Sequence, residues 1–288
     1  MGRALCAHLR ANGVPFRVLS RNLPRARRLA PGALSYHQWQ PIERGRPWVS
    51  VMEGSLALVH LASPLVENSR WTPEHKQVLY DTCVVGTQGL VSAVAQAASP
   101  PQVVVSASTV GYYQLDGGNR APVDESGPPG DDFLSRLAAD WEAAAAHVAD
   151  FGVRQVSLRS GLVLSRGGAL RRLRWAACIG FGGPVSAGRA SQAWIHLEDE
   201  LGLLLLAIDD DRARGPLNCV APDPVSNGQF MASVRRLLRI PFGAPAPGWV
   251  LPGAVPATTG RAAMPGRALA LGYDFQHPDL ESALRAPK

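Results

Sequence analysis

Apolar runs alternate with amphipathic stretches along most of the chain, at a spacing typical of strands that alternate with helices. The most regular run is Val103–Tyr113, which starts with three consecutive valines and ends in hydroxyl side chains. Three apolar residues in succession predict a strand covered on both faces, as in a parallel sheet between layers of helices. Further strands are predicted at Phe16–Leu19, Ala57–Ala62, Val156–Leu164 and Gly215–Ala221.

Helices are predicted between these strands from helical periodicity and from terminal signals. The clearest start is at Thr72, an N-cap residue that is followed by Pro73 and Glu74, and the apolar periodicity continues from there to about Ala98. The N-terminal residues predict a helix that Asn12-Gly13 closes, and further helices are predicted from about Asp131 to Val148, over Leu201–Ile208 and over Ser226–Leu238. The alternation predicts an α/β fold with a doubly wound, mostly parallel sheet.

The regular alternation ends near Leu164. We therefore divide the chain into residues 1–164 and residues 165–288, where the second part holds glycine-rich loops, the last sheet strand at about 215–221 and a small C-terminal α/β lobe. The first part begins directly in a helix, and the strand after that helix ends at Ser20-Arg21. This order is expected of a Rossmann-like, mononucleotide-binding half that lacks its first strand as given.

Composition places the chain among globular proteins. Its 288 residues are 46% hydrophobic and 18% charged, which argues against disorder. The net charge of +6 comes almost wholly from dispersed arginines, so we expect neither nucleic acid nor a membrane as a partner. The local peak at Arg21, Arg25, Arg27 and Arg28 is suited to binding one phosphate group or to coating a helix.

The four cysteines are Cys6, Cys83, Cys178 and Cys219, and none of them forms a C-x-x-C pair. Scattered single cysteines are typical of buried thiols in a reducing compartment, and they predict no metal site. No apolar stretch has the length of a membrane span, and the N-terminus lacks the apolar segment of a signal peptide. We therefore expect a cytoplasmic protein.

The end of the valine-rich strand is the strongest candidate for chemistry. In open α/β sheets, ligands bind beyond the carboxyl ends of the strands. Ser106, Ser108, Thr109 and Tyr112 occupy this position in the run that reads S-A-S-T-V-G-Y-Y. The alternative interpretation is a hydroxyl-rich strand end that leads into a surface turn.

Several motifs occur in an order that is specific in combination. These motifs are S-A-S-T-V-G-Y-Y, Arg70-Trp71-Thr72, Trp141-Glu142, R-S-G-L-V-L from Arg159 followed by Gly167-Gly168, G-F-G-G-P-V from Gly180 with Gly188, W-I-H-L-E-D from Trp194 and G-P-L-N-C-V-A-P from Gly215. With them, the chain resembles the extended short-chain dehydrogenases/reductases over nearly its whole length, and in particular their sugar-nucleotide-epimerase-like branch with a C-terminal domain of unknown function.

The resemblance implies NADP as the cofactor. Family members begin with a strand and a G-x-x-G-x-x-G loop, of which only Gly2 is present, so we expect the gene to encode the missing strand upstream of Met1. An arginine at the end of the second strand is suited to the 2′-phosphate of NADP, whereas an acidic residue there would favour NAD. The residues expected to bind the cofactor are Gly2, Ser20, Arg21, Leu61, Ala62, Ser63, Ser106, Arg136, Gly161 and Leu162.

The resemblance also implies a catalytic site, with one departure from the family. Ser108 matches the hydroxyl that holds the substrate oxygen, but Asp132 and Arg136 occupy the positions of the usual Tyr and Lys. An aspartate cannot replace the phenol in proton transfer, so Tyr112 is the candidate proton donor, with packing under the following loop as the alternative. Tyr113, Gly183 and His196 are candidate substrate contacts, and a structural histidine is the alternative for His196. Glu198-Asp199 indicate a helix N-terminus rather than an acid-base pair.

Two functions remain open from the sequence. The first is an NADP-dependent oxidoreductase or epimerase-like enzyme that acts on a small-molecule substrate, with Ser108 and Tyr112 as catalytic residues. The second is a non-catalytic NADP-binding sensor or scaffold, which the missing Tyr favours. A homodimer is a possible assembly for either function.

Overall fold

The structure is a computed structural model. It describes residues 1–40, 48–63, 72–113, 121–165, 167–184, 188–245 and 259–286. Arg70 and Trp71, which belong to one of the motifs above, lie outside the described residues.

A four-stranded parallel sheet forms the centre of the molecule. Its order is β3 (Ala57–His60), β4 (Val103–Thr109), β5 (Arg154–Ser160) and β9 (Gly215–Cys219). The register pairs Ser106 with Ser157 and Ser108 with Arg159. Because β4 lies inside this sheet and its three valines are buried, the predicted doubly covered strand is confirmed.

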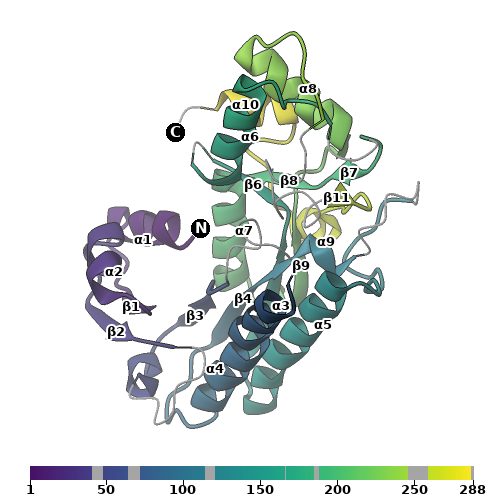
Figure 1. The fold of residues 1–288 in the computed structure, drawn as a ribbon. Coiled ribbons are helices and arrows are strands. Elements are labelled where there is room, and N and C mark those ends of the chain that lie inside the picture. The colour runs from purple at the N-terminus through teal and green to yellow at the C-terminus, as the bar shows by residue number, and fades with distance from the viewer. Residues whose placement is uncertain are drawn as a thin grey trace.

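Helices cover both faces of this sheet (Figure 1). Val104 packs with Leu90 in one apolar cluster, whereas Val105 packs with Leu203 in another, so successive β4 side chains enter different layers. The first layer contains α3 (Pro73–Tyr80), α4 (Gly86–Val94) and α5 (Phe133–Ala146). The second contains α7 (Leu197–Asp209). The predicted doubly wound α/β fold is therefore confirmed.

The N-terminal segment forms a separate small sheet. It contains α1 (Gly2–Ala11), β1 (Arg17–Ser20), α2 (Leu23–Leu29) and β2 (Ser35–Gln38). Strands β1 and β2 pair in parallel, and within the described residues no ladder joins β1 to β3. The polar sequence of β2 gave no apolar signal, so this strand was not predicted.

Two predicted elements are interrupted in the structure. The helix that Thr72 caps breaks into α3 and α4 at a five-residue π-helical segment, Asp81–Val85. The strand predicted over Val156–Leu164 divides at Gly161 into β5 and β6 (Leu162–Leu164), and β6 pairs with β8 (Trp194–His196) in a second sheet. A Cβ at Gly161 would lie 2.9 Å from the carbonyl carbon of Ala193, so glycine permits this close crossing.

The C-terminal part adds helices at one end of the molecule (Figure 1). Leu173, Phe230 and Leu284 belong to one core cluster, which joins α6 (Gly168–Cys178), α8 (Asn227–Leu238) and α10 (Leu280–Arg285). A small antiparallel sheet has the order β10 (Val225–Ser226), β7 (Ser191–Gln192) and β11 (Thr259–Gly260), and α9 (Gly266–Ala270) follows it. In the described part of the chain, no helix combines the length and apolar character needed to cross a membrane.

Candidate functional site

A buried ion pair holds the hydroxyl of Ser108 at the carboxyl end of β4. Ser108 Oγ donates a hydrogen bond of 2.6 Å to Glu142 Oε1 on α5. Arg159, which is the β5 neighbour of Ser108, binds the same carboxylate with two bonds of 2.8 Å, from Nε to Oε1 and from Nη2 to Oε2. Although burial opposes its charge, the bonds to Glu142 raise the pKa of Arg159 above its ordinary value. The orientation of the Ser108 hydroxyl is therefore set by a fixed carboxylate.

Glu142 and Arg159 each lie in one of the sequence motifs, but no role was predicted for either residue. For each of them, a feature of the sequence indicates a buried ion pair once the structure is known. Arg159 is a charged residue inside a predicted strand, and Glu142 follows Trp141 on the helix that packs against β4. A buried charge requires a partner of opposite charge, and each of these residues is the partner of the other.

The side chain of Tyr113 is buried in the core. It is 2% exposed, and its hydroxyl donates to Asn218 Oδ1 at 2.9 Å while accepting from Arg159 Nη1 at 2.8 Å. Burial raises the pKa of Tyr113 to about 12, against the weaker opposing effect of Arg159. Tyr113 thus keeps its proton and positions Arg159, and its role as a substrate contact stays a prediction.

Tyr112 has a different environment from its neighbour. Its ring lies over the guanidinium of Arg159, with 3.5 Å between Arg159 Cζ and the ring centroid. The side chain is only partly buried, and its hydroxyl has no hydrogen-bond partner within the residues that the structure describes. Of the two tyrosines, Tyr112 is the one whose hydroxyl is available to a ligand.

The positions of the family's Tyr and Lys have structural roles here. Asp132 is the N-cap of α5, and its side chain accepts a hydrogen bond of 3.0 Å from the backbone amide of Ser135. The guanidinium of Arg136 donates to the carbonyl oxygen of Asp131. Neither side chain is hydrogen bonded to the Ser108–Glu142–Arg159 network, so this part of α5 supplies its N-cap rather than the usual dyad.

Other predicted cofactor residues lie around the starts and ends of the N-terminal elements. Gly2 begins α1 beside the end of β3, since a Cβ added to it would lie 3.9 Å from Leu61 Cδ1. Arg21 follows β1 and is exposed, and among the described residues its guanidinium has no partner. Ser20 Oγ accepts from the backbone amide of Asn22 at 3.2 Å. Gly2 and Leu61 are therefore brought together, as a shared site requires.

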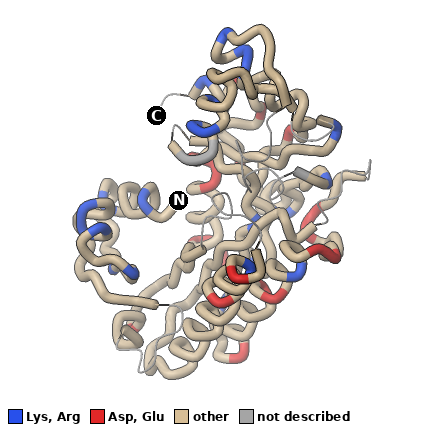
Figure 2. The backbone as a smooth tube through the Cα atoms, viewed as in Figure 1, with Lys and Arg blue, Asp and Glu red and all other residues tan. Residues whose placement is uncertain are grey.

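The N-terminal segment is uniformly basic. Residues 1–40 contain seven arginines and neither Asp nor Glu. Figure 2 shows basic residues, which are all arginines here, and no acidic residue over α1 and α2. The α2 helix also has basic residues, Arg27 and Arg28, in its last turn. This surface is suited to anionic groups.

The remaining residues predicted to bind the cofactor or the substrate contact their neighbours through backbone hydrogen bonds, apolar packing or short polar side-chain contacts. Ser106 is buried, with its Oγ 3.3 Å from Ser157 Oγ. Ala62 packs against the apolar cluster that contains Val104 of β4 and Leu90 of α4, and Ser63 Oγ lies 3.7 Å from Cys83 Sγ. The amides of Gly161, Leu162 and Gly183 donate to the carbonyls of Cys219, Ala193 and Ala244 respectively.

His196 lies apart from Ser108, at the start of α7. It is 8% exposed and caps the helix, because its Nδ1 accepts a hydrogen bond of 3.3 Å from the amide of Glu198. Its ring centroid lies 3.9 Å from that of His277. The predicted helix start at Glu198-Asp199 is thereby confirmed, and a substrate contact by His196 stays a prediction.

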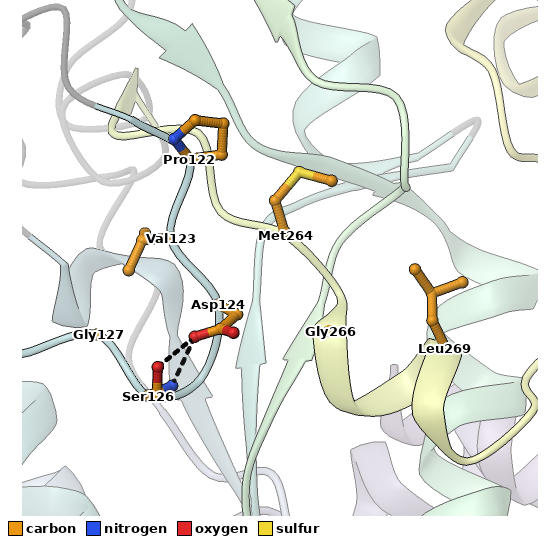
Figure 3. A pocket seen from close by; sticks show the side chains of 8 residues that line it. All are labelled: Pro122, Val123, Asp124, Ser126, Gly127, Met264, Gly266 and Leu269. Carbon is orange, nitrogen blue, oxygen red and sulfur yellow. Dashed lines mark hydrogen bonds between the residues drawn. The ribbon is translucent and has the colours of Figure 1, made fainter.

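Hydrogen bonds connect the network to the C-terminal segment. Asn218 Nδ2 donates to the carbonyl of Met264 at 2.8 Å, and the carboxylate of Glu125 accepts from the amides of Asn218 and Arg267. A cavity of about 420 Å³ lies beyond this contact, with Asp124 and Ser126 on one side and Met264 and Leu269 on the other (Figure 3). None of the residues predicted for the site is among the described residues that line this cavity.

Glu200, on α7, is a buried acid that should make stability depend on pH. It is 1% exposed and accepts a bond of 2.6 Å from Ser160 Oγ, and burial raises its pKa from 4.5 to about 7. The folded protein therefore keeps a proton that the unfolded chain loses between these values. We expect the free energy of unfolding to fall by about 3 kcal/mol as the pH rises from 4.5 to above 7.

The variant Glu200→Gln should remove this dependence, since its side chain stays neutral. Urea denaturation at pH 5 and pH 8 measures the difference. The exposed Glu74→Gln variant is the control and should keep the wild-type dependence. The same fall in stability for wild type and Glu200→Gln would show that Glu200 is not the group responsible.

Comparisons with known proteins identify the family of the chain. Residues 1–219 match the NAD dependent epimerase/dehydratase family, and residues 249–286 match a domain of unknown function, DUF1731. The epimerase family protein SDR39U1 homolog, chloroplastic, of Arabidopsis thaliana is 32% identical, over 99% of this chain and 83% of its own.

Two solved structures are also similar. The human epimerase family protein SDR39U1, isoform 2, crystallised with NADPH, superposes with a TM-score of 0.83 at 32% identity, over 99% of this chain and 94% of its own. The nucleoside-diphosphate sugar epimerase from Corynebacterium glutamicum has a TM-score of 0.70 at 26% identity, over 98% of this chain and 60% of its own. This chain belongs to the NAD dependent epimerase/dehydratase family and carries a C-terminal DUF1731 domain.

Proposed function

We propose that the protein is an NADP-dependent oxidoreductase or epimerase-like enzyme that acts on a small-molecule substrate. The observation that carries the proposal is the Ser108 hydroxyl, fixed by Glu142 and Arg159 at the carboxyl edge of the parallel sheet. In sheets of this kind, that edge is where ligands bind. A cytoplasmic location belongs to the same proposal, since the four cysteines carry no disulfide.

The residues around α1 and β1 fit a dinucleotide phosphate. Gly2 leaves the start of α1 open to close approach, and the helix N-terminus and the arginine-rich surface both favour negative charge. Arg21 offers a free, exposed guanidinium at the end of β1, where the ribose 2′-phosphate of NADP would lie. The NADPH in the crystal structure of the human relative supports the same choice of cofactor.

The side chains at the end of β4 support proton handling beside that cofactor. When bound, the nicotinamide would supply or accept a hydride. Ser108 directs its own proton to Glu142, so its free lone pairs can accept a hydrogen bond from a substrate hydroxyl. Tyr112 would exchange the proton of the substrate oxygen, since its hydroxyl is free and its ring rests on Arg159. These two residues give the proposed site a positioning group and an acid-base group.

A second function has one specific observation in its favour. Asp132 and Arg136 are engaged at the start of α5 and do not form the proton-transferring dyad of active relatives. A non-catalytic NADP-binding sensor or scaffold would not need that dyad. Hydride transfer separates the two functions, and cofactor binding alone does not.

Cofactor selectivity tests the proposal through Arg21. The wild-type protein should bind NADPH about 10- to 100-fold more tightly than NADH, because a guanidinium–phosphate contact is charge-assisted. Arg21→Ala should lose this preference while keeping its affinity for NADH. Fluorescence titration with both dinucleotides measures the effect, and Arg10→Ala, at the other end of α1, is the control for net charge. Equal affinities of the wild type for NADH and NADPH would overturn the assignment.

A further inference from the structure

Two histidines and a glutamate from segments far apart in the sequence meet at the start of α7. His277 Nε2 lies 2.7 Å from Glu198 Oε2, and His196 Nδ1 lies 3.7 Å from the same oxygen. One ligand atom from each of the three residues can be chosen so that all lie within 4.8 Å of one another. The sequence predicted no metal site, because its cysteines are scattered and His277 lies 79 residues beyond Glu198.

We propose that His196, Glu198 and His277 form a binding site for a divalent transition-metal ion of the zinc type. Two imidazoles and one carboxylate are a donor set that zinc accepts, with the fourth position left to water or another ligand. The site would join the end of β8 and the start of α7 to the segment between α9 and α10.

The exposed fractions of the three side chains fit a binding site that has a fixed shape and is open to solvent on one side. The side chains of His196 and His277 are 10% and 14% exposed, whereas that of Glu198 is 45% exposed. The imidazoles are therefore held by packing, while an ion can enter from the side of the carboxylate. That open side also leaves room for a water ligand.

The backbone amide of Glu198 competes with a metal ion for one nitrogen of His196. His196 Nδ1 accepts the hydrogen of that amide at 3.3 Å, which occupies the single lone pair of this nitrogen. Metal binding through Nδ1 must therefore replace this hydrogen bond.

The backbone around His277 is fixed independently of its imidazole. The carboxylate of Asp199 accepts hydrogen bonds from the amides of Gln276 at 2.8 Å and His277 at 3.0 Å, and from the Tyr273 hydroxyl at 3.2 Å. A variant that lacks the imidazole therefore keeps the contacts that dock this segment on α7. The imidazole of His277 can therefore be replaced without removing the hydrogen bonds that hold its backbone segment in place.

Metal binding requires a rearrangement of the hydrogen bonds within the cluster. With bonds of about 2.0–2.2 Å, the ligand atoms of a tetrahedral zinc site lie about 3.3 Å apart. The hydrogen bond between His277 and Glu198 must therefore lengthen, and His277 Nε2 must give up its proton, either to its own Nδ1 or to solvent.

Titration of the metal-stripped full chain with Zn²⁺, and with Co²⁺ as a spectroscopic probe, tests the proposal. We expect one equivalent to bind with micromolar or tighter affinity, with Co²⁺ absorption typical of a low-coordinate site and with an increase in thermal stability. His277→Asn and Glu198→Gln should each weaken binding by about 10-fold or more. Mg²⁺ should not compete, because it prefers a set of oxygen ligands.

His147→Ala is the matched control. His147 and Asp150 form an exposed pair, with 3.2 Å between His147 Nδ1 and Asp150 Oδ2, that also offers one nitrogen and one carboxylate. This variant should bind Zn²⁺ as the wild type does. Circular dichroism in EDTA checks that each variant is folded. The proposal is overturned if the folded wild type shows no saturable binding, or if folded His277→Asn and Glu198→Gln bind Zn²⁺ as the wild type does.

Discussion

Replacing Arg159 by methionine is expected to lower the free energy of unfolding by about 3–5 kcal/mol, because it leaves the Glu142 carboxylate, whose side chain is only 13% exposed, without its counter-charge. Arg159 is 3% exposed, and it binds Glu142 through two nitrogens and the Tyr113 hydroxyl through a third. Methionine retains much of the volume of the side chain but none of these donors. Denaturation in urea with linear extrapolation measures the loss.

An exposed ion pair of almost the same length is the control. Arg236 Nη1 lies 2.7 Å from Glu281 Oε1, but the two side chains are 67% and 51% exposed. Arg236→Met should cost less than about 1 kcal/mol, since solvent screens such pairs. The double variant Glu142→Met/Arg159→Met should recover part of the loss, because it removes both charges. Similar small losses at both ion pairs would contradict a structural role for the buried one.

Replacing Tyr112 by phenylalanine is expected to reduce the turnover number by about 10²- to 10⁴-fold, the usual contribution of a positioned acid-base group. The ring still rests on Arg159, so folding and NADPH affinity should change little. Ser108→Ala should also reduce turnover, and its cost in stability should be about 1 kcal/mol because Glu142 keeps its bonds to Arg159. The measurement is the rate of hydride exchange with a substrate.

Tyr80→Phe, on the exposed face of α3, is the control for removing a phenol from the surface. Its turnover should equal that of the wild type. If Tyr112→Phe and Ser108→Ala both turn over at the wild-type rate while remaining folded, the catalytic assignment of these two residues fails.

The sequence was sufficient to predict the parallel sheet and the position of the hydroxyl side chains at its carboxyl edge. The three valines of β4 predict a strand that is buried on both faces. The hydroxyl side chains that follow them must then lie at the carboxyl end of this strand. The Thr72 N-cap and the Asn12-Gly13 helix end were also readable, because capping depends on local residue types.

The partners of those hydroxyls could not be predicted, because they come from other elements. Glu142 lies 34 residues after Ser108, and only the packing of α5 on β4 brings the two together. The same holds for His277, which reaches His196 through the docking of the C-terminal segment. The break at Gly161 escaped prediction because its cause, the close approach of Ala193, is also remote in sequence.

Transfer of deuterium from NADPH labelled at C4 of the nicotinamide tests the central claim most directly. The protein is incubated with labelled NADPH and a panel of small carbonyl compounds, and in parallel with NADP⁺ and a panel of nucleotide sugars, and the products are examined by chromatography and mass spectrometry. A reductase should move the label from NADPH into at least one carbonyl compound, whereas an epimerase-like enzyme, which returns the hydride that it removes, should convert a nucleotide sugar into its epimer in the presence of NADP⁺; Tyr112→Phe and Ser108→Ala should slow either reaction. NADPH that keeps its label with every carbonyl compound, together with nucleotide sugars that stay unchanged with NADP⁺, would contradict the proposed activity and favour a non-catalytic NADP-binding protein.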